Sequence, residues 1–308
     1  MDGAAPTGTV ASASGSAAAT DANEFVPYTG SATVSYLGGN GGIYDAQTVN
    51  STGVTGLTAT LASGTFADGT SGTVTYNISG TPDIYSSTPI SANNNNAVFN
   101  VTIGGKSATL TVNVIGQPYL EVAGKKWMDR NLGAPGVATS STDTANYGDL
   151  YQWGRESDGH QLRTSSTIAG QQANTYSDPN FITVGVAEDW TNNPDANLWN
   201  SGTEGAPIKT AKDPCPTGYR IPTKTEFQLL TGVINNATDA FNLLKLPLSG
   251  GRFYEGNVNR NIGISGFYWT SSDGSGGSQS DFYNVEPSST AISLNTRAHG
   301  NSIRCIRE

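Results

Sequence analysis

Apolar and polar residues alternate in short runs along the first third of the chain. A period of two places every apolar side chain of a strand on the same face, so each run predicts a β-strand with one buried face. The clearest runs have their apolar positions at Ala32, Val34 and Tyr36, at Leu57, Ala59 and Leu61, and at Val74, Tyr76 and Ile78. Turn-forming residues separate these runs, which favours a sheet of several short strands.

Two further runs, Phe99–Ile103 and Ala108–Val114, flank the dipeptide Gly104–Gly105. Two alternating strands around a Gly-Gly turn predict a β-hairpin. With the earlier runs, the hairpin predicts a small Ig-like β-sandwich over residues 24–116. The region lacks the Cys, Trp and Cys pattern of antibody domains, which excludes an antibody-type domain.

The segment before the sandwich, residues 1–23, consists almost entirely of Ala, Ser, Thr, Gly and Asp, and Val10 is its one branched aliphatic residue. Such a composition buries too little apolar surface to offset the entropy lost on ordering. We therefore expect a flexible N-terminal arm.

The pattern changes after residues 116–118, where we expect a boundary, and residues 118–308 form the second predicted domain. Its clearest helix start is Thr223–Glu226, because a Thr followed by Glu three residues later is a capping box. A second short helix is expected over Thr238–Leu244. After Leu246 the chain is rich in Gly, Asn, Ser and aromatic residues, which is typical of loops carried on short strands. The predicted fold class is mainly β with some α.

The charge of the chain limits its partners. It holds 16 Lys and Arg against 25 Asp and Glu, a net charge of -9. An acidic protein repels phosphates and anionic lipid headgroups, so we expect no nucleic-acid partner. No stretch approaches the roughly 20 apolar residues of a membrane-spanning helix, so no membrane insertion of the domains is expected either. All basic residues except Lys106, and both histidines, follow the boundary. The first domain therefore has few groups suited to chemistry, and we expect it to be a spacer.

The two cysteines, Cys215 and Cys305, exclude a four-thiolate metal site, because such a site needs four. A Cys2His2 zinc site would require both of them together with His160 and His299, every His and Cys in the chain. A single disulfide is the favoured interpretation, while two buried thiols and a redox pair remain open.

Four segments of the second domain carry a resemblance. The segments are Trp127–Leu132, Tyr147–Arg155, Asp213–Thr223, and Tyr268–Ser272 followed by Ile303–Arg307. In order, spacing and residue type they resemble the Fibrobacter succinogenes major paralogous domain, a C-type-lectin-like family common in surface proteins of Bacteroidetes. The match covers about residues 118–308.

This resemblance implies a C-type-lectin-like α+β domain with a small twisted antiparallel sheet, two helices and a long irregular region that displays surface loops. It implies that Cys215 and Cys305 approach each other, which supports the disulfide. It also implies a core position for three tryptophans and buried pairing roles for two arginines. These residues are Trp127, Trp153, Trp269, Arg220 and Arg304.

Two related families suggest different functions. Variable proteins diversified by retroelements in bacteria and their phages carry many substitutable, solvent-facing positions on this fold, whereas formylglycine-generating enzymes oxidise a cysteine of their substrate. Carbohydrate-binding C-type lectins chelate calcium and sugar with a Glu-Pro-Asn or Gln-Pro-Asp run and a Trp-Asn-Asp run. Here the nearest fragment to the first is Glu286–Ser288, and Trp269 is followed by Thr270, so lectin-type calcium binding is not supported. We expect no metal and no cofactor, and no motif supports a structural calcium ion.

The stretch from Gly250 to Asn301 is rich in Tyr, Asn, Ser, Gly and Arg, the mixture that antibody loops use for recognition. Any loop-rich surface also contains these residues, so a surface without a ligand remains the alternative. The predicted ligand-binding residues are Arg252, Tyr254, Glu255, Asn257, Asn259, Arg260, Asn261, Asp273, Asp281, Tyr283, Asn284, Glu286, Asn295, Arg297 and His299.

Strand periodicity in residues 281–286 places Phe282 and Asn284 on one face and Tyr283 and Val285 on the other, so the aromatic residues there do not all reach solvent. Tyr254 and Tyr283 are preferred as binding residues over the neighbouring phenylalanines, because a phenol tolerates water at its tip.

Catalysis is less well supported. Formylglycine-type oxidation needs a reactive cysteine pair, and no second cysteine lies near Cys305 in sequence. The carboxylates show no glycosidase motif, and His160 and His299 have no nucleophile at an informative spacing.

We therefore expect a non-enzymatic ligand-binding or adhesion protein. Its C-terminal head would present a loop surface, hypervariable if the gene is diversified, to a protein or glycan on another cell or host surface. The expected location is extracellular, on a bacterial cell surface, a pilus or a phage virion. The alternatives are a formylglycine-generating-type oxidoreductase on the same fold and a purely structural virion or envelope component.

Overall fold

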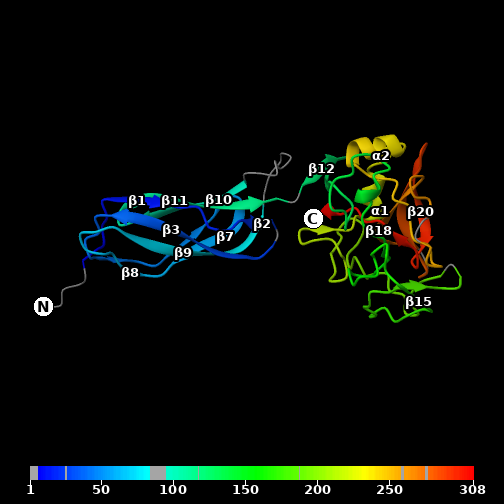
Figure 1. Ribbon diagram of the computed structural model, residues 1–308, viewed down its shortest axis with the longest axis horizontal. Coiled ribbons are helices and arrows are strands. Elements are labelled where there is room, and N and C mark those ends of the chain that lie inside the picture. The colour runs from blue at the N-terminus through cyan, green and yellow to red at the C-terminus, as the bar shows by residue number, and fades with distance from the viewer. Residues whose placement is uncertain are drawn as a thin grey trace. The chain divides into compact units, whose positions relative to one another are not determined.

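The computed structural model divides the chain into two compact units, Met1–Pro118 and Tyr119–Glu308, called the first and second unit below (Figure 1). It describes residues 6–24, 26–83, 95–116, 118–186, 188–257, 260–274 and 277–308. The protein is mainly β, as expected. Over these ranges, no helix has the length and apolar character that crossing a lipid bilayer demands.

The first unit contains a five-stranded and a four-stranded sheet, and a short pair of strands beside them. Apolar side chains from both sheets share one core, with Val34, Ala59 and Tyr76 fully buried in it. The five-stranded sheet has the order β1 (Ser12–Gly15), β3 (Tyr28–Leu37), β9 (Gly72–Asp83), β7 (Thr55–Leu61) and β5 (Gln47–Asn50). The four-stranded sheet has the order β2 (Ala22–Asn23), β11 (Lys106–Ile115), β10 (Asn95–Ile103) and β6 (Thr52–Gly53). The extra pair is β4 (Ile43–Tyr44) with β8 (Gly64–Thr65).

The predicted hairpin is confirmed. Strands β10 and β11 pair antiparallel, with Ile103 opposite Lys106 at the turn end. Gly104 and Gly105 both have positive φ, 54° and 77°, which a two-residue hairpin turn requires and which residues with a Cβ rarely adopt. The buried positions alternate along both strands as the sequence pattern predicts.

The prediction of a flexible arm over residues 1–23 is wrong for the described part of that segment. Strand β1 pairs with β3, and the chain then moves to the other sheet, where Ala17 bridges Thr111 of β11 in parallel. Main-chain hydrogen bonds, which composition does not reveal, hold this segment. Small residues are needed where the chain passes from one sheet to the other, because a Cβ at Gly15 would overlap the carbonyl oxygen of Thr109.

The second unit has short strands joined by long irregular segments. One sheet has the order β12 (Tyr119–Val122), β13 (Lys125–Met128), β22 (Ile306–Arg307) and β17 (Tyr219–Arg220). A three-stranded antiparallel sheet contains β18 (Gly266–Asp273), β19 (Gln279–Val285) and β20 (Thr290–Thr296). Two pairs complete it, β14 (Tyr151–Gln152) with β21 (Gly300–Asn301), and β15 (Thr167–Ala169) with β16 (Phe181–Thr183). A 3-10 turn, η1, spans Thr144–Asn146.

Both predicted helices are present. Helix α1 (Lys224–Gln228) starts at the predicted capping box, in which Thr223 accepts from the Glu226 amide and the Glu226 carboxylate accepts from the Thr223 amide. Helix α2 (Ala237–Leu244) ends at Lys245 in a left-handed conformation. The helices cover a core that includes Trp127, Phe227 and Tyr283.

Buried polar side chains hold the irregular segments together. All five tryptophans are fully buried, as predicted for Trp127, Trp153 and Trp269, and each indole N–H donates to a main-chain carbonyl. Arg220 pairs with Glu226 at 2.6 Å, and Arg304 donates to carbonyls and to Asn131.

The disulfide is present in the structure. Cys215 and Cys305 are bonded, with their Cα atoms 5.9 Å apart, and the bond ties the C-terminal segment to the segment before β17. Both cysteines are buried.

The place of β1 in the first unit can be tested at Gly15. The change Gly15→Val should lower the free energy of unfolding of this unit by about 1–3 kcal/mol, since the backbone must move to admit a Cβ. Denaturation followed by circular dichroism measures this loss. Tryptophan fluorescence, which arises from the second unit only, should show an unchanged transition.

The exposed neighbour Ser14 provides the matched control, and Ser14→Ala should leave both transitions in place. A Gly15→Val protein as stable as the wild type would mean that the segment does not cross between the sheets as described.

Candidate functional site

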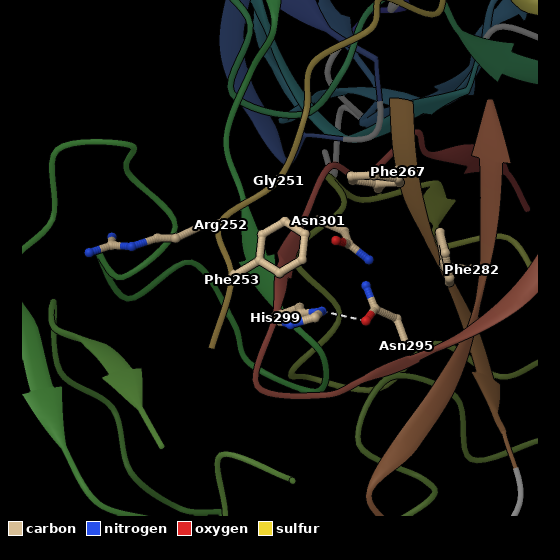
Figure 2. A pocket seen from close by; sticks show the side chains of 8 residues that line it. All are labelled: Gly251, Arg252, Phe253, Phe267, Phe282, Asn295, His299 and Asn301. Atoms are coloured by element: carbon tan, nitrogen blue, oxygen red, sulfur yellow. Dashed lines mark hydrogen bonds between the residues drawn. The ribbon is translucent and has the colours of Figure 1, made fainter. Parts of the chain in front are cut away.

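A small cleft of about 190 Å³ opens in the second unit, between the segment after Gly250, the strands β18 and β19, and the chain from the end of β20 to β21 (Figure 2). It lies inside the stretch that the sequence singles out for recognition. Its lining residues are Gly251, Arg252, Phe253, Phe267, Phe282, Asn295, His299 and Asn301.

Three phenylalanine rings form the walls of the cleft. Phe253 lies on one side, and Phe267 and Phe282 lie opposite it (Figure 2). The rings of Phe267 and Phe282 meet edge to face, with centroids 5.8 Å apart, and their strands are paired. The apolar walls therefore stand on a fixed sheet.

Two asparagine amides lie between the walls. The Oδ1 of Asn295 accepts from the Thr296 amide at 3.0 Å and from Nδ1 of His299, so its nitrogen faces the cleft. Figure 2 shows the nitrogens of Asn295 and Asn301 pointing toward each other. Asn301 is 1% exposed, and no described residue accepts a hydrogen bond from its Nδ2. A buried unsatisfied donor costs about 1–3 kcal/mol, a cost that an acceptor on a ligand would remove.

His299 sits between two aromatic rings, with Phe253 at 4.5 Å and Tyr254 stacked at 5.3 Å between centroids. Burial lowers the pKa of His299 to about 4, although the charge of Glu255 acts in the opposite direction. The ring is therefore neutral at pH 7, and Nδ1 must carry its proton because Asn295 Oδ1 can only accept.

Arg252 was predicted to bind ligand, but its guanidinium points away from the cleft (Figure 2). It donates to Ser165 Oγ at 2.6 Å and to the Gly256 carbonyl at 3.2 Å, and it lies over the Phe181 ring. Burial lowers the pKa of Arg252 to about 10, still well above neutrality. The residue fixes the segment that carries Phe253.

Several predicted residues form the rim of this region. Tyr254 is half-buried against His299, and Arg260 is exposed and lies over the Phe253 ring at 4.5 Å. The exposed predicted residues nearby in sequence are Glu255, Asn257 and Asn261. Asn259 lies outside the described residues.

The preference for Tyr283 over Phe282 is wrong. Tyr283 is fully buried and stacks on Phe227 with centroids 4.9 Å apart, and burial raises the pKa of its phenol to about 12. The predicted alternation is present, but the face that holds Phe282 is the one that lines the cleft.

Five other predicted residues are used for packing and lie outside the cleft lining. Asp281 pairs with Lys224 at 3.1 Å, and Asn284 donates to Glu286. Arg297 is 1% exposed and pairs with Asp273 and Asp189. The structure thus gathers Asn295 and His299 at the cleft and turns Asp273, Asp281, Asn284, Glu286 and Arg297 to other contacts.

Five cleft residues, Gly251, Phe253, Phe267, Phe282 and Asn301, were not among the predicted site residues. The alternation in residues 281–286 carried the signal for Phe282. For Asn301 the sequence offered no signal, because only the folded chain reveals that its amide nitrogen has no partner among the described residues.

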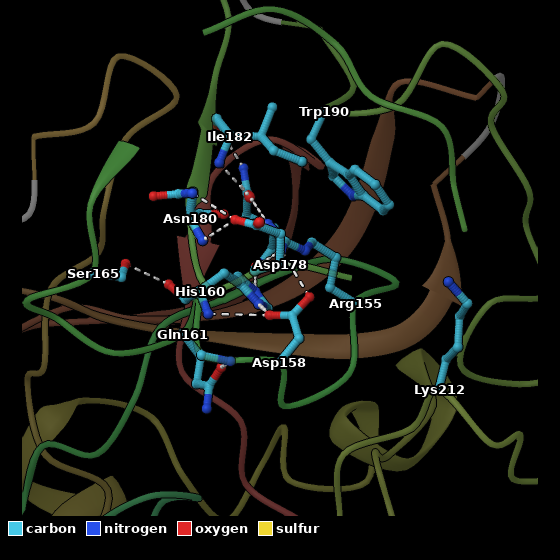
Figure 3. Close-up of polar contacts among 12 residues, drawn as sticks. Arg155, Asp158, His160, Gln161, Ser165, Asp178, Asn180, Ile182, Trp190 and Lys212 are labelled. Atoms are coloured by element: carbon cyan, nitrogen blue, oxygen red, sulfur yellow. Dashed lines mark hydrogen bonds and ion pairs between the residues drawn. The ribbon is translucent and has the colours of Figure 1, made fainter. Parts of the chain in front are cut away.

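A second polar cluster, around His160, is a closed network (Figure 3). His160 is fully buried, with Nδ1 2.5 Å from Asp158, and its Nε2 accepts from the Gln152 amide at 3.1 Å. Arg155 donates to Asp158 and to the Asp178 carbonyl. Both ring nitrogens of His160 are thus occupied within the fold, and neither is available to a substrate.

These contacts set two pKa values. Burial lowers the pKa of His160 to about 4, against the effect of its hydrogen bond to Asp158. Burial alone would raise the pKa of Asp158, but the hydrogen bond and charge of His160 and the charge of Arg155 lower it to about 2.

The described part of the chain contains no group of three or more His, Cys, Asp or Glu side chains that could hold a metal ion. Comparisons with known protein families, with curated proteins and with solved structures gave no significant match for this chain.

The buried neutral His160 predicts a pH effect on stability. Its pKa is about 6.5 unfolded and about 4 folded, so the unfolded chain binds more protons between these values and acid removes stability. Between pH 7 and 4.5 the difference in free energy of unfolding between wild type and His160→Gln should fall by roughly 2 kcal/mol. Urea unfolding followed by tryptophan fluorescence measures this difference.

Wild type and His160→Gln must be compared because other groups also titrate in this range. Burial raises the pKa of Asp149 and Asp189 to about 6, so these carboxyls make the fold more stable as the pH falls, opposite to the effect of His160. A difference that stays constant from pH 7 to 4.5 would show that His160 is not held neutral by the fold.

Proposed function

We propose that the second unit is a non-enzymatic recognition module that binds a neutral group of a partner molecule in the cleft between Phe253 and Phe282. The observation that carries this proposal is the buried amide of Asn301, whose donor has no acceptor among the described residues. Small-molecule and glycan sites are mostly apolar with a few fixed polar groups, and this cleft has that composition.

The finer fold assignment is part of the proposal. Two sheets with a shared core, and a first strand that moves between them, support an Ig-like sandwich in the first unit. Two helices, the buried tryptophans and the disulfide support a C-type-lectin-like second unit of the Fibrobacter succinogenes major paralogous type. The first unit would act as the spacer of a displayed head.

The residues that could serve in catalysis are engaged in contacts within the fold, which favours binding over catalysis. Both ring nitrogens of His160 are hydrogen-bonded, to Asp158 and to the Gln152 main-chain amide. Both cysteines are buried and bonded to each other, so neither is a free thiol, which disfavours a formylglycine-generating oxidoreductase. A disulfide is typical of oxidising compartments and supports the proposed extracellular setting, on a bacterial surface, a pilus or a virion. Changes at the exposed rim residue Arg260 would alter partner choice without disturbing the core.

The proposal predicts that partner binding depends on the cleft. On arrays of glycans and of extracellular proteins, Asn301→Ala and Phe282→Ala should each weaken binding of the recognised partner about 10-fold or more. Asn301→Ala removes a hydrogen bond to the ligand and Phe282→Ala removes an apolar wall of the cleft, and each loss is expected to cost about 1–3 kcal/mol of binding free energy. A loss of about 1.4 kcal/mol weakens the affinity tenfold.

The matched control is Asn193→Ala, because Asn193 is exposed and does not line the cleft. Binding that survives both cleft changes, or the absence of any partner on either array, would contradict the proposal.

A further inference from the structure

The cleft takes a neutral group. Arg252 is the one formally charged residue among those that line it, and its guanidinium is turned toward Ser165 and Phe181. His299 is neutral, because burial holds its pKa near 4. A carboxylate, phosphate or ammonium group would lose its hydration here without gaining an opposite charge, which is unfavourable.

The side-chain amides of Asn295 and Asn301 turn their donors toward the cleft, while Nε2 of His299, which carries no proton, is an acceptor without a partner among the described residues. The orientation of Asn295 is fixed by the Thr296 amide, which places the nitrogen toward Asn301, and the nitrogen of Asn301 faces it (Figure 2). A carbonyl oxygen brings acceptor sites only, so it matches the two amide nitrogens. Where that carbonyl belongs to a secondary amide, the N–H of the amide is a donor, for which Nε2 of His299 is an unpaired acceptor in the lining.

The walls require an apolar end beside that carbonyl. Phe253, Phe267 and Phe282 bound a space of about 190 Å³, enough for a small group and too little for an extended chain. A methyl group attached to the carbonyl meets both conditions. The acetyl group is the common biological unit with a methyl carbon on a neutral carbonyl.

The rim favours a sugar as the carrier of this acetyl group. Tyr254 is half-buried at the edge, where a phenol provides a broad apolar face with a polar tip. Glu255 and Arg260 are exposed beside it and supply an acceptor and donors for hydroxyl groups. A ring with several hydroxyls therefore finds partners at the mouth of the cleft.

We propose that the cleft binds the acetamido group of an N-acetylated sugar, with its carbonyl oxygen accepting from Asn301 and Asn295 and its methyl group between Phe253 and Phe282. This inference rests on the proposed function of the cleft as a recognition site. It assigns the chemical class of the ligand.

The test uses the full chain and three probes, methyl N-acetyl-β-glucosaminide, methyl β-glucoside and the peptide analogue N-acetylalanine methylamide. In saturation-transfer NMR the acetyl methyl of the sugar should receive the strongest signal. Calorimetry should show the N-acetylated sugar binding at least 10-fold more tightly than the other two probes.

The change Asn301→Asp replaces the donor by an acceptor of similar shape, and it should abolish the preference for the acetamido group. The exposed Asn193→Asp is the matched control for the added charge. Phe282→Leu, which keeps an apolar side chain, should weaken binding less than Asn301→Asp, and circular dichroism and tryptophan fluorescence of each variant test whether the unit still folds.

Equal binding of the glucoside and the N-acetylated sugar would overturn the acetamido assignment and leave the recognition function standing. Tighter binding of the peptide analogue would overturn the assignment to a sugar. If no probe binds, and Asn301→Ala and Phe282→Ala still bind the partners found on the arrays, both the recognition function of the cleft and the acetamido assignment are overturned.

Discussion

The second unit depends on hydrogen bonds from buried side chains to main-chain carbonyls. Its strands are short and its connecting segments are long, so ladders satisfy only part of the buried backbone. The five tryptophan indoles and the guanidinium groups of Arg155 and Arg304 supply many of the missing donors. Three of these bonds, from Trp153, Trp269 and Arg304, span more than a hundred residues of sequence. The disulfide holds the same C-terminal segment at one further point.

This anchoring positions the cleft. Arg252 and Gly300 exchange main-chain hydrogen bonds at 2.9 and 2.7 Å, and Gln152 donates to the Ala298 carbonyl. Arg297, paired with Asp189 and lying over the Trp153 ring, fixes the end of β20. The segment on both sides of His299 is therefore held in place, and within it Nδ2 of Asn301 has no acceptor among the described residues. A preformed donor of this kind favours binding, since little further ordering is needed.

Local rules predicted the local features. The Gly104–Gly105 hairpin and the capping box at Thr223 follow from a few adjacent residues, and both are present. The sequence also singled out the stretch that contains the cleft. It did not select the residues within it, because Arg, Asp and Asn serve as buried anchors and as binding groups alike. Arg297 and Tyr283 are buried, and which face of β19 lines a cleft is decided by distant contacts such as that with Phe227. The composition of residues 12–15 likewise did not reveal that β1 pairs with β3, because that pairing depends on main-chain contacts with a distant strand.

The central claim is that the side-chain amide of Asn301 is an unpaired donor that receives the ligand. The most direct measurement is NMR of the side-chain amide protons in isotope-labelled protein during titration with methyl N-acetyl-β-glucosaminide. The account predicts that the Asn301 signals move downfield as a hydrogen bond forms, while those of Asn284, already bonded to Glu286, stay in place. Asn301 signals that do not respond to a saturating ligand would contradict it.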